Sequence, residues 1–311
     1  MARIVFMGTP AFAVPALCAL MREHTVTGVV TQPDRPVGRG RQVQPSPITQ
    51  VAREHRLPLI QPASLRKDPV AVEQLRAWAP DVIAVAAFGQ ILRREVLDIP
   101  PHGCLNVHAS LLPRWRGAAP INHAILAGDD VTGVSIMQIR PGLDDGPVLL
   151  SASLPIGPDD TTATLGPRLA ELGAELLLAA LPGWLAGTLR ALPQDESRVT
   201  LAPPLEKEHG RLDWSRPAAA LERQVRACDP WPGTFTTWQG RVLKVLRASP
   251  VSSGAGPAAA PGEVVALDRD LAVGTGDGLL RLEQVQLEGK RTVSGAEFVR
   301  GYQHILGSRL E

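Results

Sequence analysis

The sequence has few cysteines and no long apolar run. Its three cysteines, Cys18, Cys104 and Cys228, are widely spaced and odd in number. This argues against a disulfide framework and a cysteine-based metal site, and favours a reducing compartment. No stretch of about 18 apolar residues is present, so no membrane span is expected. The N-terminal MARIVFMGTP predicts a buried strand and not a signal peptide. We therefore expect a cytoplasmic protein that binds no metal and contacts no membrane.

The sequence also has almost no excess of positive over negative charge. The net charge is +1, and lysine occurs only at positions 67, 207, 244 and 290. Composition alone therefore gives no sign of a nucleic-acid partner, which a strongly basic balance would have given. The 311 residues, 44% hydrophobic and 20% charged, are typical of a soluble globular chain with one large domain or two ordinary ones.

Short runs rich in Val and Ile alternate with helical patterns over the first two-thirds of the chain. Runs without clear alternation are typical of parallel strands covered on both faces. They are ARIVFMG, VTGVVT, DVIAVAAF, GCLNVH and GVSIMQ. Helices are expected at 12–21, 46–55, 70–78, 91–97, 120–126 and, with interruptions, 161–189. This order predicts a doubly wound, mostly parallel, Rossmann-like α/β sheet, whose ligands bind beyond the carboxyl ends of the strands.

The character of the sequence changes after residue 189. The polar, Pro-rich ALPQDESRVTLAPP predicts a linker at 190–204 between a first domain, 1–189, and a second domain, 205–311. In the second domain a helix at 217–228 precedes short alternating runs: TFTTW, RVLKVLRA, GEVVAL, LAVGT and LLRLEQVQL. Several short strands with turn signals predict a small β-barrel. We expect Trp214, Trp231 and Trp238 in its core.

Polar side chains follow two of the predicted strands. Asn106 and His108 are two residues apart in GCLNVH, so an extended backbone points both to one face. An amide N–H can bind a developing oxyanion, and an imidazole can add charge or move a proton, as acyl transfer requires. Asp144 follows GVSIMQ and could return to orient His108. The spacing alone is weak, and turn chemistry by itself explains an Asp beside Gly.

The segment 105–149 carries a stronger signal. NVHASLLPRWRGAAPI, followed by GLDDG, resembles the folate-dependent formyltransferases, and SLLPRWRGAAPI is similar in particular to members that act on initiator methionyl-tRNA. FMGTP, TQPDRPVGRG, DWS and DPWP extend the resemblance over nearly the whole chain. Asp145, where Thr or a similar residue is expected, is a small departure that puts no catalytic role in doubt.

The resemblance implies an activity and a catalytic set. The activity is transfer of the formyl group of 10-formyltetrahydrofolate to the α-amino group of methionine on initiator tRNA, for translation initiation. The catalytic residues would be Asn106, His108 and Asp144. No protein nucleophile is needed, because the free amine attacks, and none is evident in the sequence.

The resemblance also implies where the two substrates bind. The folate would contact Ser110, Leu111, Leu112 and Pro113, in a largely apolar pocket that includes 88–92. The tRNA would be held by an OB-like second domain and by an arginine loop carrying Arg35, Arg39 and Arg41. Arginine suits phosphates and unpaired bases by bidentate pairing and stacking, although a solvated surface loop would look the same. We expect a monomer.

Several alternatives remain open on the sequence. A sister formyltransferase acting on glycinamide ribonucleotide or an amino sugar nucleotide would share the catalytic set and SLLP, but would lack the arginine loop and this second domain. A formate-releasing hydrolase of the same folate, and a non-catalytic RNA- or nucleotide-binding protein, are the others. Trp115 fits a stacking platform and simple packing equally well. Because SLLP must turn sharply, Leu112–Pro113 is the bond most expected to be cis.

Overall fold

The computed structural model describes residues 1–37, 42–251, 256–268 and 270–311, which form two compact units. The first unit comprises Met1–Pro120, Val131–Pro155 and Gly166–Pro203. The second comprises Ile121–Asp130, Ile156–Leu165 and Pro204–Glu311. The units are therefore interleaved in sequence, because two short segments, Ile121–Asp130 and Ile156–Leu165, pack with the C-terminal part. The domain limits expected at 189 and 205 stay a prediction.

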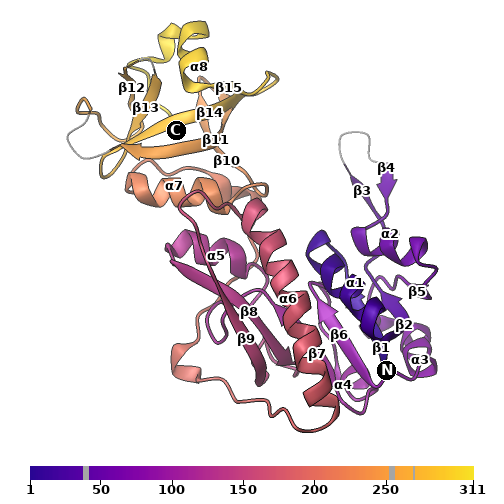
Figure 1. The fold of residues 1–311 in the computed structure, drawn as a ribbon. Helices are drawn as coiled ribbons and strands as arrows, with labels where there is room; N and C mark the ends of the chain where they lie inside the picture. Colours follow the sequence, from indigo (N-terminus) through magenta and orange to yellow (C-terminus); the bar gives the residue numbers. More distant parts are fainter. Residues whose placement is uncertain (38–41, 252–255, 269) are drawn as a thin grey trace. The chain divides into compact units, whose positions relative to one another are not determined.

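A seven-stranded mixed sheet forms the centre of the first unit, in the order β5-β2-β1-β6-β7-β8-β9 (Figure 1). Its first five members run parallel, and β8 and β9 run antiparallel to their neighbours. The strands are β1 (Arg3–Gly8), β2 (Thr25–Val30), β5 (Leu59–Ile60), β6 (Val82–Ala86), β7 (Cys104–His108), β8 (Val131–Gln138) and β9 (Val148–Pro155). This confirms the Rossmann-like α/β prediction. The expectation that GVSIMQ adds a parallel strand is wrong, because the chain returns through α5 (Pro120–Ala127) and lays β8 against β7 in the opposite direction.

Two helices of the first unit, α2 (Pro47–Glu54) and α3 (Pro69–Ala77), begin at strong start signals. Ser46 and Asp68 accept backbone hydrogen bonds from Thr49 and Ala71, and a proline follows each of these caps. The other helices are α1 (Val14–Glu23), α4 (Arg94–Leu97) and α6 (Thr162–Leu185), whose first turn belongs to the second unit. Helix α4 is shorter than the predicted 91–97. None of the described helices has the length and apolar character needed to cross a membrane.

Short elements complete the two units. A two-stranded hairpin consists of β3 (Arg35–Val37) and β4 (Gln42–Gln44), so Arg35 lies in a strand and not in a loop. Arg39 and Arg41, predicted to bind tRNA, lie outside the described residues. The 3-10 helices are η1 (Ala11–Ala13), η2 (Leu65–Lys67), η3 (Glu196–Arg198), η4 (Lys207–Gly210) and η5 (Gln303–Ile305).

An antiparallel sheet with the order β10-β11-β14-β13-β12 forms the second unit (Figure 1). Its strands are β10 (Thr234–Trp238), β11 (Arg241–Val251), β12 (Val264–Leu267), β13 (Asp270–Gly274), β14 (Leu279–Leu287) and β15 (Val293–Ser294), which pairs with β14. Its helices are α5 (Pro120–Ala127), α7 (Ala218–Ala227) and α8 (Gly295–Gly301). Among the described strands no pair closes this sheet into a barrel.

The core of the second unit confirms part of the tryptophan prediction. Trp214 and Trp238 are buried, and Trp238 packs edge-on against Phe298 at a centroid distance of 5.8 Å. Trp231 is instead 61% exposed, so its prediction as a core residue is wrong. It lies between Pro230 and Pro232 in the turn before β10, outside the alternating strand pattern that buries Trp238.

The packing around Gly28 gives a testable stability prediction. A Cβ at this position of β2 would lie 2.2 Å from Cε3 of Trp78, which packs against the core. Overpacking typically costs about 1–3 kcal/mol, so we expect Gly28→Ala to lower the free energy of unfolding by that amount. Urea unfolding followed by fluorescence measures it. Gly301→Ala, with no atom within 4 Å of the added methyl group, is the control. Equal stability of both variants would contradict the prediction.

Candidate functional site

Strand β7 presents Asn106 and His108 on the same face of the sheet, as their spacing predicts. Asn106 is flanked by Val85 of β6 and Met137 of β8. His108, at the carboxyl end of the strand, is only 5% exposed. The Asn106 carboxamide is half-buried and makes no hydrogen bond with the part of the chain that the structure describes. It is therefore available as a donor or an acceptor.

Both ring nitrogens of His108 face an acceptor. Nε2 lies 2.9 Å from the backbone oxygen of Trp115, and Nδ1 lies 3.6 Å from Oδ2 of Asp144. A carbonyl oxygen can only accept, so the first contact requires the proton on Nε2. The structure thus brings His108 and Asp144 together, although they are 36 positions apart in the sequence.

Asp144 reaches His108 by a route that the sequence did not indicate. Because β8 is antiparallel, its last residue, Gln138, lies beside Leu105 and not beside His108. The segment 139–147 therefore has to fold back along β7. There the Gly117 N–H donates to Oδ2 of Asp144 at 3.0 Å, and Asp144 adopts a left-handed backbone with φ +46°. Asp145 is exposed in the same turn.

The SLLP segment is a tightly bonded turn. The buried Ser110 donates from its hydroxyl to the Arg114 carbonyl at 2.6 Å, and the N–H of Leu112 donates to the Ser135 hydroxyl at 3.1 Å. The side chains of 111–113 are half-buried. The predicted cis bond at Leu112–Pro113 is confirmed. Cis bonds at Asp229–Pro230 and Trp231–Pro232 were not predicted.

Trp115 has several contacts in this turn. The Arg114 guanidinium lies 4.3 Å from the centre of its ring, close enough for a cation–π contact. Its N–H donates to Thr200 Oγ1 at 2.9 Å, and its φ is +64°. The backbone of Trp115, through its carbonyl oxygen, contacts His108, whereas the ring is paired with Arg114.

Sequence reasoning missed a buried arginine beside the site. Arg116 is only 6% exposed and donates to both carboxylate oxygens of Glu196, at 3.2 and 2.8 Å. The hydrogen bond from Arg116 lowers the pKa of the Glu196 carboxyl. The Glu lies in what the sequence presented as a linker. Only the adjoining RWRG string, part of the family motif, could have drawn attention to this arginine.

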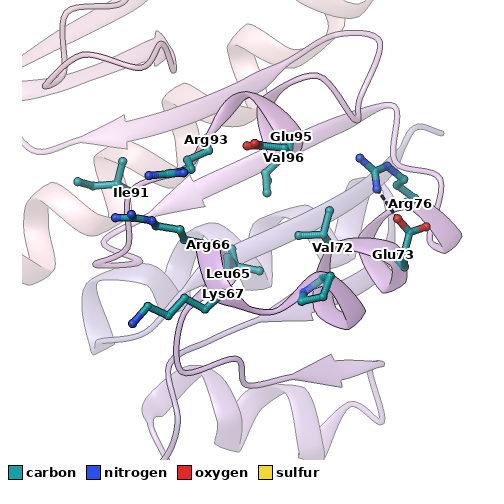
Figure 2. A pocket seen from close by; sticks show the side chains of 11 residues that line it. Leu65, Arg66, Lys67, Val72, Glu73, Arg76, Ile91, Arg93, Glu95 and Val96 are labelled. Atoms are coloured by element: carbon teal, nitrogen blue, oxygen red, sulfur yellow. Dashed lines mark hydrogen bonds and ion pairs between the residues drawn. The ribbon is translucent and has the colours of Figure 1, made fainter.

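A separate hollow of about 310 Å³ lies between α3 and the segment 91–96. It is lined by Leu65, Arg66, Lys67, Pro69, Val72, Glu73, Arg76, Ile91, Arg93, Glu95 and Val96. Figure 2 shows the guanidinium groups of Arg66 and Arg93 pointing toward the end of the pocket where Ile91 lies. Arg76 is paired with Glu73, whereas no ion pair is seen for Arg66, Lys67 or Arg93 within the described ranges. The lining thus holds three cations without an ion pair, together with the carboxylates of Glu73 and Glu95.

Two further groups bear on the chemistry. Burial raises the pKa of the Cys104 thiol to about 12 and that of Cys228 to about 11, so neither is poised as a nucleophile. The described residues include no group of three His, Cys, Asp or Glu side chains that could hold a metal ion. Arg35, at the start of the β3–β4 hairpin, is exposed and donates to Gln32 at 2.5 Å.

Known proteins match nearly the whole chain. Residues 2–181 match the model of the formyl transferase family, and residues 204–303 match that of the formyl transferase C-terminal domain. The methionyl-tRNA formyltransferase of Methylococcus capsulatus is 52% identical over 309 residues, covering 99% of both chains. That of Myxococcus xanthus is 49% identical over 308 residues, covering 99% of this chain and 97% of the relative.

Solved structures share the fold at lower identity. HypX from Aquifex aeolicus in complex with tetrahydrofolic acid matches with a TM-score of 0.65 and 22% identity, over 98% of this chain and 48% of that chain. WlaRD, a sugar 3N-formyl transferase, matches with a TM-score of 0.66 and 15% identity, over 94% of this chain and 99% of that chain. At these identities the likeness concerns the fold alone. The two family matches and the nearly full-length relatives place the chain in the formyl transferase family, among the methionyl-tRNA formyltransferases.

Proposed function

We propose that this chain transfers the formyl group of 10-formyltetrahydrofolate to the α-amino group of methionine on initiator tRNA. The observation that carries the proposal is the His108–Asp144 pair, with Asn106 on the same strand face, in a chain that matches methionyl-tRNA formyltransferases from end to end. The acceptor supplies its own nucleophile, which fits a chain whose buried thiols, Cys104 and Cys228, have raised pKa values.

The reaction balances without a further reactant. The amine nitrogen forms a bond to the formyl carbon, whose carbonyl oxygen takes up negative charge. The bond between that carbon and the folate nitrogen then breaks, the folate nitrogen gains a proton, and the former amine loses one. Formyl-methionyl-tRNA and tetrahydrofolate are the products. The protein has to stabilise one oxyanion and pass one proton.

The three polar side chains fit these two tasks. The unpaired carboxamide of Asn106 would donate to the oxyanion. His108 would add a hydrogen bond or positive charge, after its Nε2 exchanges the Trp115 carbonyl for substrate. Asp144, beside Nδ1, would orient the ring and accept the amine's proton through a water molecule. Because His108 is nearly buried, these interactions would act in a low dielectric and be strong.

The folate would bind along the turn at 110–113 and the loop 88–92. Phe88 and Leu92 are buried, and the half-buried Leu111 and Leu112 offer apolar surface to a pterin ring. Ser110 would shape the turn through its bond to Arg114, since its own hydroxyl is fully buried. The glutamate end of a folate is anionic, and the unpaired cations Arg66, Lys67 and Arg93 adjoin this loop at Ile91.

The tRNA would be held by the second domain, 205–311, by Arg35, and by Arg39 and Arg41, which follow it in the sequence. The antiparallel strands of that domain would form the OB-like barrel that its turn pattern predicts. Asp34 supports the base of the hairpin through bonds from Thr49 at 3.1 Å and Gln61 at 2.8 Å. We place the enzyme in the cytoplasm, where initiator tRNA is charged, as a monomer with a catalytic domain at 1–189 and a linker at 190–204.

Removing either donor should affect turnover more than binding. We expect Asn106→Ala and His108→Ala to lower kcat for formylation of charged initiator tRNA on the order of 10²–10³-fold, with folate affinity largely retained. Single-turnover kinetics and folate titration measure the two quantities. Glycinamide ribonucleotide and an amino sugar nucleotide, tested as acceptors with the unmodified chain, should stay unformylated. If these variants instead lost folate affinity while the bound complex kept full turnover, the roles given to Asn106 and His108 would be wrong.

The cationic hollow should contribute to folate affinity alone. An exposed ion pair contributes up to about 1 kcal/mol, so we expect Arg66→Ala and Arg93→Ala each to raise the folate KM by up to about fivefold and to spare kcat. Arg22→Ala, on the exposed surface of α1, is the control. A folate KM that responds equally to all three changes, or to none, would argue against a folate tail in this hollow.

We expect the positive charges of Arg35, Arg39 and Arg41 to contribute to tRNA affinity. If they contact phosphates, Arg39→Ala should raise the tRNA KM, and each lost contact should flatten the salt dependence by about one unit of slope. Arg35→Ala should have a smaller effect, since Arg35 already donates to Gln32. Kinetics with charged initiator tRNA at several salt concentrations give both quantities. An unchanged KM and slope for Arg39→Ala would leave these arginines as a solvated surface.

A further inference from the structure

The segment 192–202, here called the strap, is bonded into the catalytic unit and is not a free linker. At its start, Leu192 and Val148 exchange two backbone hydrogen bonds of 2.8 Å. At its end, Thr200 accepts from the N–H of Arg116 at 2.9 Å, and Ala202 donates to the carbonyl of Arg116 at 2.7 Å. The strap therefore joins the loop 139–147 to the turn 113–119, the two segments that meet at His108.

Gln194 lies in this strap, and both polar atoms of its side chain are hydrogen-bonded to residues outside the strap. Its Nε2 donates to the backbone oxygens of Asp144 and Gly146, at 2.7 Å each. Its Oε1 accepts from Nε of Arg116 at 3.0 Å. With both N–H bonds and the oxygen engaged, the amide has one orientation and cannot turn without losing hydrogen bonds. It ties the loop that carries Asp144 to the turn that contains Arg116.

The side-chain oxygen of Gln194 is held by a buried charged residue, Arg116. Arg116 is 6% exposed, and a buried guanidinium needs an anionic partner to offset its lost hydration. Glu196 provides that partner through two hydrogen bonds, although its own side chain is 72% exposed. The ion pair thereby holds the Nε of Arg116 toward Gln194.

Asp144 needs such support because of its backbone. A non-glycine residue at φ +46° persists where its surroundings determine the conformation. Two contacts do so here. Gln194 holds the carbonyl oxygen of Asp144, and the N–H of Gly117 holds Oδ2, which lies 3.6 Å from His108. Without the first contact, the loop is free to relax and the carboxylate to move away from the imidazole.

We propose that Gln194 is a positioning residue for formyl transfer, which holds the Asp144 backbone so that its carboxylate faces His108. Arg116 and Glu196 in turn hold Gln194. The inference rests on the proposed function, because it acts on a reaction in which Asp144 orients His108. A misplacement of about 1 Å far from the reacting atoms can lower turnover on the order of 10²-fold.

The variant Gln194→Glu tests these hydrogen bonds with minimal change of side-chain shape. It keeps the oxygen that accepts from Arg116 and replaces both N–H donors with a second acceptor. We expect kcat with charged initiator tRNA to fall on the order of 10²-fold, the folate KM to stay near the wild-type value, and the pH profile of kcat to change. A wild-type kcat and pH profile would overturn the proposal.

The second unit contains a matched control. Gln224, which is buried where Gln194 is half-buried, donates to two backbone oxygens, His209 and Arg211, at 2.8 and 2.9 Å, and accepts from Arg216 at 3.1 Å. Gln224→Glu should therefore lower Tm at least as much as Gln194→Glu, with kcat and its pH profile unchanged. If both variants lowered kcat in proportion to their loss of Tm, Gln194 would be merely structural.

A double-mutant cycle with Asp144→Asn locates the effect. If Gln194 acts through Asp144, the double variant should be no slower than Asp144→Asn alone. If the fold-losses in kcat of the two single variants multiplied in the double variant, the proposal would be overturned. Should Gln194→Glu fail to fold, the exposed change Glu196→Gln decides instead, since a lower kcat with an unchanged folate KM supports the proposal and a wild-type kcat overturns it. Wild-type protein inactive on charged initiator tRNA would overturn the proposed function itself.

Discussion

The site depends on one carboxylate being held between a backbone N–H and an imidazole. Oδ2 of Asp144 accepts from Gly117 and faces His108. Gly117 has φ +126°, and a Cβ on it would lie 2.6 Å from the carbonyl oxygen of Ala202. Only glycine accommodates both the conformation and the close approach of the strap. A single residue without a side chain thus allows the strap to approach the two segments that meet at the histidine.

The sheet and the loops contribute differently to this arrangement. Strand β7 lies between β6 and β8, which fixes Asn106 and His108 on a rigid support. Asp144 comes from a loop whose strained backbone is held by hydrogen bonds from two other segments. A site built this way has one rigid half and one half whose geometry depends on polar contacts. The polar contacts are accordingly where substitutions outside the catalytic set should change turnover.

The sequence predicted local structure well where side-chain periodicity is strong. The runs TFTTW and LLRLEQVQL coincide with β10 and β14, and the face shared by Asn106 and His108 follows from strand geometry. It failed where direction and long-range bonding decide. Nothing in GVSIMQ distinguishes an antiparallel strand, since a buried strand is apolar in either direction. The strap has no period because its backbone hydrogen bonds go to single points, Val148 at the start of β9 and the turn at Arg116, and form no continuous strand. The partners of Gln194 lie 48 to 78 positions away.

The strap changes where this chain can be divided. By composition, 190–204 is the natural place for a cut, an inserted domain or a permuted terminus, since exposed Pro-rich segments usually tolerate such changes. Here the backbone hydrogen bonds of Leu192, Thr200 and Ala202 and the side chain of Gln194 complete the catalytic unit. An excised catalytic fragment would therefore have to retain residues through Pro203. In the evolution of such chains, an acceptor-binding module could therefore be exchanged only at the few peptide bonds directly after Pro203.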